Sequence, residues 1–362
     1  MRLISLLAVA SLFLGGCATV EPSVEPTASE IATQQVETET QTEPGEAPEA
    51  EAEPEPGEAP EPEAEPEPEP AVTTQELMEL IKTVPSSDLE SLRQHFLLID
   101  EGAQSLEPFP IEYQMGPTAV PEKVELVIDR FSQKMKMFQL VGLESLDQDW
   151  VLASEKDYEW WVEYRTNQEP DFPIELWDAE RNELGHCRLS SDVFCGAGNG
   201  VNGKNYQDNV VGTRFTDRGL NYVARHEGAH FYQAVFGYGG RCWFAEGQAT
   251  FFETYLETSA RSRFQVIQDL LRSPSNVGDA SEQELIDLVS SDSVCSPDYR
   301  VAYDLGMLAF EYLYMNFSFT QVHDLMVRSS DIAWELAVAE VLNVEPKALN
   351  EALARYVYSQ IQ

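Results

Sequence analysis

The stretch HEGAH, residues 226–230, decides the fold that the sequence predicts. In a helix, residues four positions apart lie on one face and about one turn apart, so the rings of His226 and His230 can converge on one metal ion. An N-cap candidate, Thr216, precedes this stretch, and a helix-stopping residue, Gly237, follows it. The sequence therefore predicts that both histidines lie in one helix.

A second helix is predicted from Trp243 to Arg261, because apolar residues recur there at helical spacing. Glu246 lies at the edge of its apolar face. Two packed antiparallel helices would bring this carboxylate to the two histidines. Two imidazoles and one carboxylate form a common ligand set of catalytic zinc sites, which keep a fourth position open for water. We therefore expect one Zn²⁺ ion bound by His226, His230 and Glu246.

Two more carboxylates are predicted near this ion. Glu227 follows the first histidine and can take a proton from the attacking water as a general base. Glu253 lies two turns beyond Glu246, so it is either the alternative third ligand or a residue that orients a histidine by a hydrogen bond. A packing role for the two histidines is the other interpretation, and the nearby Glu246 argues against it.

These residues resemble the gluzincin metallopeptidases, a thermolysin-like group in which a Glu on the following helix completes the HExxH motif. The resemblance covers residues 210–358 and includes WFAEG, residues 243–247, and YDLG, residues 303–306. The spacing from His230 to Glu246 is shorter than in thermolysin and is more similar to a broad set of peptidase-like proteins that carry WLxEG. The resemblance implies a zincin-like catalytic domain with a helical C-terminal portion.

The same resemblance implies two further roles. A strand predicted from Val210 to Phe215 corresponds to the edge strand that pairs with an extended peptide in gluzincins, and a purely structural strand is the alternative. Tyr303 is the candidate donor of a hydrogen bond to the oxyanion, a role that gluzincins give to a Tyr or His after the third ligand. Tyr299, Tyr312 and His323 compete for this role, and core packing is the other interpretation of Tyr303.

The N-terminus has the pattern of an exported lipoprotein. Residues 1–17 combine a basic start, a short apolar run and the sequence LGGC, which matches a bacterial lipobox. The run is too short to span a membrane, so we expect Cys17 to be lipidated after signal cleavage. An ordinary signal peptide is the alternative. Ala18 resembles the residue after the cysteine in outer-membrane lipoproteins, so we expect a lipid-anchored envelope protein that faces the periplasm or the surface.

Residues 18–72 are predicted to be a disordered acidic tether. They contain 17 Glu, no Lys or Arg and no aromatic residue. Such a segment cannot bury enough apolar surface to offset the entropy of ordering, and its like charges extend it. Binding of a partner or of calcium is the alternative, although the segment lacks the Asp/Asn/Gly pattern of a calcium loop.

The net charge disfavours some partners. The chain has a formal net charge of −40, to which residues 1–72 contribute one Arg and 17 Glu, so residues 73–362 still carry −24. A domain of this charge repels nucleic acid and anionic lipid surfaces. We therefore expect no nucleic-acid partner. The resemblance to gluzincins implies peptide or protein substrates.

The remaining patterns predict an α+β fold that is mostly helical. Residues 73–145 are predicted to form an N-terminal helical segment, and residues 146–362 the catalytic domain. Residues 150–153 predict a buried strand and the Gly-rich residues 196–203 a turn between strands, so a small antiparallel sheet is expected before the metal-binding helix. C-terminal helices are predicted for residues 299–317, for residues 332–342 with Asp331 as their cap, and for residues 346–361.

Four cysteines remain after lipidation, namely Cys187, Cys195, Cys242 and Cys295. An exported compartment is oxidising, and an even number of cysteines there favours disulfides, for which three sets of pairings are open. Pairing of neighbours along the chain is the simplest choice. We therefore expect the disulfides Cys187–Cys195 and Cys242–Cys295.

These patterns predict a membrane-tethered, zinc-dependent peptidase that hydrolyses peptide bonds in the cell envelope or outside it. One alternative is a peptidase-like envelope lipoprotein with little or no turnover that acts in binding or assembly. Another is a hydrolase of peptidoglycan peptides. Glu227 argues against the first alternative, because a structural zinc site does not need a general base.

Overall fold

The computed structural model describes the chain between Thr73 and Gln362, with gaps. The predicted signal segment (1–17) and tether (18–72) lie outside the described residues. For residues 149, 195–199, 205–210 and 217–218 only the backbone is described. The described residues are 73–86, 88–145, 149–154, 156–168, 195–199, 205–210, 217–238, 240–258, 260–273, 277–291 and 301–362.

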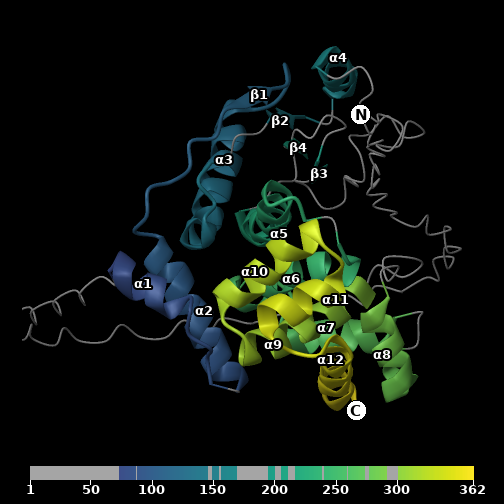
Figure 1. Ribbon diagram of the computed structural model, residues 1–362. Coiled ribbons are helices and arrows are strands. Elements are labelled where there is room, and N and C mark those ends of the chain that lie inside the picture. The colour runs from purple at the N-terminus through teal and green to yellow at the C-terminus, as the bar shows by residue number, and fades with distance from the viewer. Residues whose placement is uncertain are drawn as a thin grey trace, which may run out of the picture. The chain divides into compact units, whose positions relative to one another are not determined.

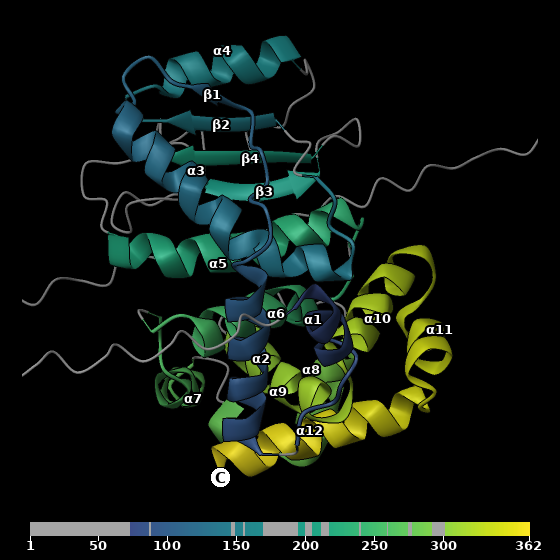
Figure 2. The same ribbon diagram turned by 90° about the vertical axis from the view of Figure 1, so that its left-hand side faces the viewer.

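Helices make up most of the described chain (Figures 1 and 2). They are α1 (Thr74–Leu80), α2 (Leu89–Ala103), α3 (Pro121–Met135), α4 (Tyr158–Gln168), α5 (Asp217–Val235), α6 (Cys242–Leu256), α7 (Arg263–Leu271), α8 (Glu282–Ser290), α9 (Gly306–Asn316), α10 (Phe319–Asp331), α11 (Trp334–Ala337) and α12 (Pro346–Ile361). Tighter 3-10 turns follow α3 (Lys136–Val141) and precede α8 (Val277–Asp279), and wider π turns precede α9 (Val301–Leu305) and follow α11 (Val338–Leu342). The prediction of a mostly helical fold is therefore confirmed.

A four-stranded sheet lies beside the helices, with strand order β1-β2-β4-β3 (Figure 2). The strands are β1 (Tyr113–Met115), β2 (Asp149–Ala153), β3 (Cys195–Asn199) and β4 (Asn205–Val210). Strands β1 and β4 both pair with β2 in parallel, and only β3 and β4 pair antiparallel. The predicted antiparallel sheet is therefore wrong for β1, β2 and β4. For β1 and β2 the cause is helix α3, because a helical crossover between them returns the chain to the same end of the sheet and makes the strands parallel.

The strand before the metal-binding helix also differs from its prediction. The structure has β4 at 205–210, whereas the strand was expected at 210–215, and residues 211–216 lie outside the described part. Part of the Gly-rich stretch expected as a turn is β3, because backbone pairing with β4 does not require side chains. Strand β4 is central and β3 forms the edge, so the expected edge-strand role does not fit β4.

The buried strand predicted at residues 150–153 is confirmed as part of β2. Trp150 is fully buried between the sheet and two helices. Its ring lies 5.1 Å from that of Phe131 on α3 and 5.4 Å from that of Phe231 on α5, measured between centroids. Helix α3 also packs along α5. The sheet is therefore fixed to the helix that carries the histidines.

The predicted segment 73–145 belongs to the same compact unit as the rest of the described chain. It contributes β1 to the sheet, and its helix α2 packs against α6. Leu92, Phe96 and Ile99 of α2 are buried.

All three predicted C-terminal ranges contain helical structure, and only the predicted cap at Asp331 is wrong. Helix α9 is buried on most of its surface, and the carboxylate of Glu345 caps α12 by accepting from the backbone N–H of Ala348 at 2.7 Å. Helix α11 and the π turn after it occupy 334–342 of the predicted 332–342, but their N-cap is Ala333 and not Asp331. Asp331 instead ends α10, an additional helix that begins with a capping box of Ser318 and Gln321. None of the helices within the described ranges combines the length and apolar character that crossing a bilayer requires.

Candidate metal centre

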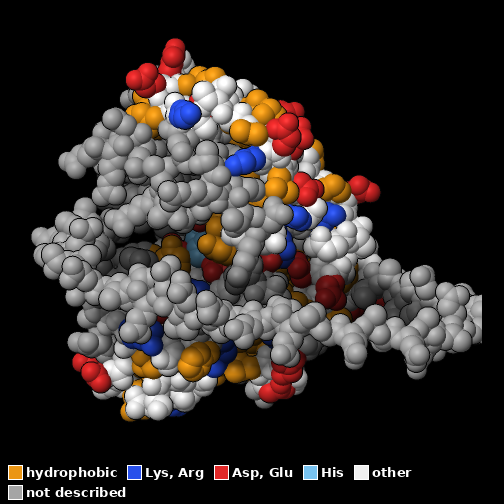
Figure 3. All heavy atoms as spheres, turned by 180° about the vertical axis from the view of Figure 1, so that it is seen from behind, with side chains coloured by type: hydrophobic (Ala, Val, Ile, Leu, Met, Phe, Trp, Pro, Cys, Tyr) orange, Lys and Arg blue, Asp and Glu red, His pale blue; other side chains and the backbone are white. Residues whose placement is uncertain are grey.

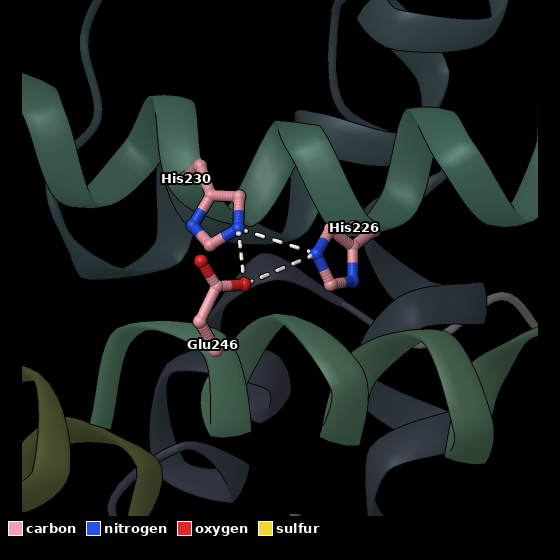
Figure 4. A group of neighbouring side chains, drawn as sticks. All are labelled: His226, His230 and Glu246. Atoms are coloured by element: carbon pink, nitrogen blue, oxygen red, sulfur yellow. Dashed lines mark hydrogen bonds and ion pairs between the residues drawn. The ribbon is translucent and has the colours of Figure 1, made fainter. Parts of the chain in front are cut away.

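Helices α5 and α6 bring three predicted ligands together (Figure 4). His226 Nε2 and His230 Nε2 lie 3.2 Å apart. Glu246 Oε2 lies 3.1 Å from His230 Nε2 and 3.5 Å from His226 Nε2. These three atoms form a nearly equilateral triangle. Within the described ranges, no other three metal-ligating side chains come as close together.

The triangle fits a tetrahedral zinc ion. Zinc binds imidazole nitrogen and carboxylate oxygen at about 2.0–2.2 Å, so neighbouring ligand atoms of a tetrahedron lie about 3.3–3.5 Å apart. The three measured separations of 3.1–3.5 Å match or lie close to these edges. Three protein ligands leave the fourth corner for water or substrate, which is the arrangement of catalytic zinc sites.

The opposite nitrogen of each imidazole is held by a hydrogen bond. His226 Nδ1 donates to Glu253 Oε2 at 3.0 Å, and His230 Nδ1 lies 3.0 Å from Gln233 Oε1. Two roles were predicted for Glu253, third ligand or orienting residue, and its position fits the orienting role. Glu246 lies at the ligand position. A hydrogen bond of this kind fixes the ring and leaves Nε2 to bind metal.

The centre attracts positive charge. Burial lowers the pKa of His226, but hydrogen bonds with Glu246 and Glu253 outweigh burial and raise the pKa to about 10. The pKa of His230 is also raised, because Glu246 outweighs the effect of burial. Burial raises the pKa of Glu246, but the two histidines hold it well below its usual range. A metal dication bound by His226, His230 and Glu246 would replace the positive charge that protons on the two histidines supply.

Glu227 lies on α5 beside these groups and is half-buried. The pKa of its carboxyl is raised, because burial outweighs the charges of His230 and His226, which lower it. The carboxylate of Glu227 is therefore close enough to both histidines to interact with their charges. The side chains of His230 and Glu246 are 18% and 21% exposed, against 9% for His226, so solvent reaches the triangle from the side of His230 and Glu246. A histidine is visible in a hollow of the surface in Figure 3.

Tyr303 lies against the metal centre. Its ring stacks on that of His226, with 5.4 Å between centroids and an angle of 8° between the planes. Tyr303 belongs to the π turn before α9, and the next residue, Asp304, is buried and forms an ion pair with Arg261 at 2.9 Å. Short π-helical turns beside α-helices are frequent at functional sites.

The three competitors of Tyr303 have other surroundings. His323 hydrogen-bonds with the hydroxyl of Tyr232 at 2.6 Å, and burial lowers its pKa to about 4. Tyr312 packs its ring against that of Tyr356 on α12. Tyr299 lies outside the described residues.

Two residues of the site were missed by the sequence interpretation. Gln233 hydrogen-bonds with His230, and its spacing of three residues on one helix was the available signal. Arg225 precedes His226 and is fully buried. It donates to Asp100 at 2.7 Å and to Glu257 at 3.2 Å, so it ties the start of the metal-binding region to α2 and to the end of α6. No local pattern indicates these partners.

The cysteines are only partly described. Cys242, at the start of α6, is disulfide-bonded. Cys187 and Cys295 lie outside the described residues, and only the backbone of Cys195 is described. The pairings Cys187–Cys195 and Cys242–Cys295 therefore stay predictions.

No protein-family model, curated protein or solved structure matches this chain.

Proposed function

We propose that this protein is a zinc-dependent peptidase. The observation that supports the proposal most is the triangle of His226 Nε2, His230 Nε2 and Glu246 Oε2, whose edges of 3.1–3.5 Å suit zinc and leave a fourth corner open. A zinc ion bound there would supply a Lewis acid that polarises a peptide carbonyl and makes water more acidic.

The residues of the chain have separate roles in this proposal. Glu227 accepts a proton from the water that attacks the carbonyl carbon, and it delivers a proton to the leaving amine as the carbon–nitrogen bond breaks. His226 and His230 would bind the ion as neutral rings in place of their protons, held by Glu253 and Gln233. Tyr303, stacked on His226, donates a hydrogen bond to the oxygen on which negative charge develops.

Hydrolysis assays test the proposal. Purified protein is incubated with casein, short peptides and muropeptides, with and without a chelator and with zinc restored. We expect hydrolysis of casein or peptides that the chelator abolishes and zinc restores. Glu227→Gln is expected to keep its zinc and fold and to lose about 10²–10⁴-fold in turnover. Equal turnover of this variant and the parent would contradict the mechanism, and cleavage of muropeptides alone would favour the peptidoglycan alternative.

The proposed location is the bacterial envelope, with Cys17 as the lipid anchor and residues 18–72 as a tether. Cell fractionation and labelling with a fatty acid test this part. The parent is expected in the membrane fraction with label, and Cys17→Ser without label. A labelled Cys17→Ser protein would refute the anchor and would leave the zinc chemistry untouched.

A further inference from the structure

The side chain of Gln233 connects two of the candidate ligands. Its Oε1 lies 3.0 Å from Nδ1 of His230. Its Nε2 donates at 3.0 Å to the backbone carbonyl of Ala245, the residue directly before Glu246. Gln233 is almost fully buried, with 3% of its surface exposed, so water does not compete for these bonds. One side chain therefore links the ring of one ligand to the helical turn that carries another.

The donors of Gln233 determine the orientation of its amide. A glutamine amide has two N–H donors on nitrogen and only acceptor positions on oxygen. The nitrogen lies 3.0 Å from the Ala245 carbonyl and 2.9 Å from Oε1 of Gln248. A backbone carbonyl can only accept, so the group that faces it must be the NH₂ group. The oxygen of Gln233 must then face His230.

This orientation determines the tautomer of His230. Because Gln233 Oε1 can only accept, Nδ1 of His230 must carry the hydrogen. The lone pair of the neutral ring then lies on Nε2, the atom at the corner of the triangle. A ring with the hydrogen on Nε2 could not bind metal through that atom.

The bonds continue into the core. Nε2 of Gln248 donates to the hydroxyl of Tyr314 at 3.1 Å. Gln248 is fully buried and Tyr314 is 1% exposed. The chain of bonds thus runs from His230 on α5 through Gln248 on α6 to Tyr314 on α9, and a misdirected amide at any step would leave a buried polar group without its partner.

We propose that Gln233 is a positioning residue of the metal centre, which holds His230 in its metal-binding tautomer and sets the α6 turn of Glu246 against it, with Gln248 fixing the direction of its amide. The proposal rests on the zinc site of the proposed function but not on turnover. The proposed role of Gln233 concerns zinc affinity, which is measured without substrate.

The test compares zinc affinity across matched variants. Gln233→Met keeps the length of the side chain and removes both hydrogen-bonding groups. Gln248→Met removes the second acceptor and leaves the Ala245 carbonyl in place. Gln139→Met is the control, because Gln139 also donates to a backbone carbonyl, that of Glu107 at 2.8 Å, but away from the centre. Circular dichroism establishes folding, and titration with zinc against a chromophoric chelator gives the dissociation constants.

We expect Gln233→Met to bind one zinc about 10–100-fold more weakly than the parent. Gln248→Met is expected to bind more weakly by a smaller factor, and the double variant no more weakly than Gln233→Met alone, because Gln248 acts through Gln233. Gln139→Met is expected to match the parent. In ring-nitrogen NMR of the zinc-loaded protein, we expect the Nδ1 hydrogen of His230 to exchange slowly in the parent and rapidly in Gln233→Met.

Other outcomes would overturn the proposal. A Gln233→Met protein that binds zinc within twofold of the parent refutes it, as does additivity of the two substitutions. If Gln233→Met does not fold, Gln248→Met decides, and parent-like affinity in that variant refutes the proposal. A parent that binds no zinc refutes the metal site itself, whereas a parent that binds zinc without hydrolysing any substrate refutes only the peptidase function.

Discussion

Gly247 and Gly306 lie against each other where α6 crosses the start of α9, and neither position has room for a side chain. A Cβ atom added to Gly306 would lie 2.7 Å from Cα of Gly247, and one added to Gly247 would meet the carbonyl carbon of Gly306. Gly247 follows Glu246, and Gly306 begins α9 directly after the π turn that contains Tyr303. The contact therefore sets how deeply the carboxylate and the phenol approach the histidines.

We expect Gly247→Ala to lower the free energy of unfolding by about 1–3 kcal/mol, because overpacking forces the two helices apart. Urea unfolding measures the change, and zinc affinity is expected to fall with it. Gly228→Ala is the control, because a Cβ atom there would lie 3.1 Å from the flexible Met135 side chain and not against backbone. An equal stability of the two variants would show that the helices separate without cost.

Glu246 and Glu253 are expected to respond differently to the same substitution. Glu246→Gln removes a charged ligand, so we expect zinc to be lost at concentrations that saturate the parent. Glu253→Gln keeps an acceptor for Nδ1 of His226, so we expect one zinc per chain bound about 10–100-fold more weakly. Metal content after dialysis and chelator titration distinguish the two. Unchanged zinc in Glu246→Gln would overturn its assignment as a ligand.

His323 is expected to make stability depend on pH. Its pKa is about 4 in the folded chain, below its ordinary value of 6.5, because burial disfavours the charged ring. Between these values the unfolded chain binds the proton and the folded chain does not, so stability falls as the pH falls from 6.5 towards 4. The loss from pH 7 to pH 4.5 is about 2–3 kcal/mol.

His323→Gln removes the titrating ring and keeps a polar partner for Tyr232. Urea unfolding at pH 7 and pH 4.5 should therefore show a smaller loss for this variant than for the parent, by about 2–3 kcal/mol. The carboxylates titrate in both proteins and cancel in the comparison. Parallel losses would mean that His323 takes up its proton in the folded state as readily as in the unfolded chain.

The parts of the site that could be predicted are those with a local pattern. HExxH requires only that its residues lie in one helix, and the stop at Gly237, where φ is +71°, marks the end of that helix. Glu246 followed from a second amphipathic helix nearby in the sequence. The partners of Arg225 could not be predicted, because Asp100 lies 125 residues away and a buried arginine has no pattern that indicates its partner.

The sheet shows the same limit. The backbone hydrogen bonds that pair β2 with β4 join segments far apart in the chain, and the sequence of β3, CGAGN, has no alternation of apolar and polar residues. The parallel direction of β1 and β2 follows from helix α3 between them. The residue pattern within a single strand does not indicate this direction.

Tyr303→Phe tests the proposed oxyanion donor, because it removes only the hydroxyl. The phenyl ring keeps its stacking on His226, so zinc affinity and melting temperature are expected to stay at their parent values. Loss of a hydrogen bond made in the transition state is expected to lower kcat about 10²–10³-fold, which corresponds to about 2.7–4 kcal/mol. The binding of substrate before reaction should change little, so KM is expected to stay near the parent value.

Tyr312→Phe is the control for this prediction, because Tyr312 lies on α9 in the same region of the chain but packs against Tyr356 on α12. Parent-like kcat in Tyr303→Phe would assign the ring a packing role and leave the oxyanion to the metal. A further variant, Asp304→Asn, weakens the ion pair of 2.9 Å with Arg261 that holds the π turn. If that turn positions the hydroxyl, Asp304→Asn lowers kcat in the parent but has no additional effect in Tyr303→Phe, because the group that it positions is already absent.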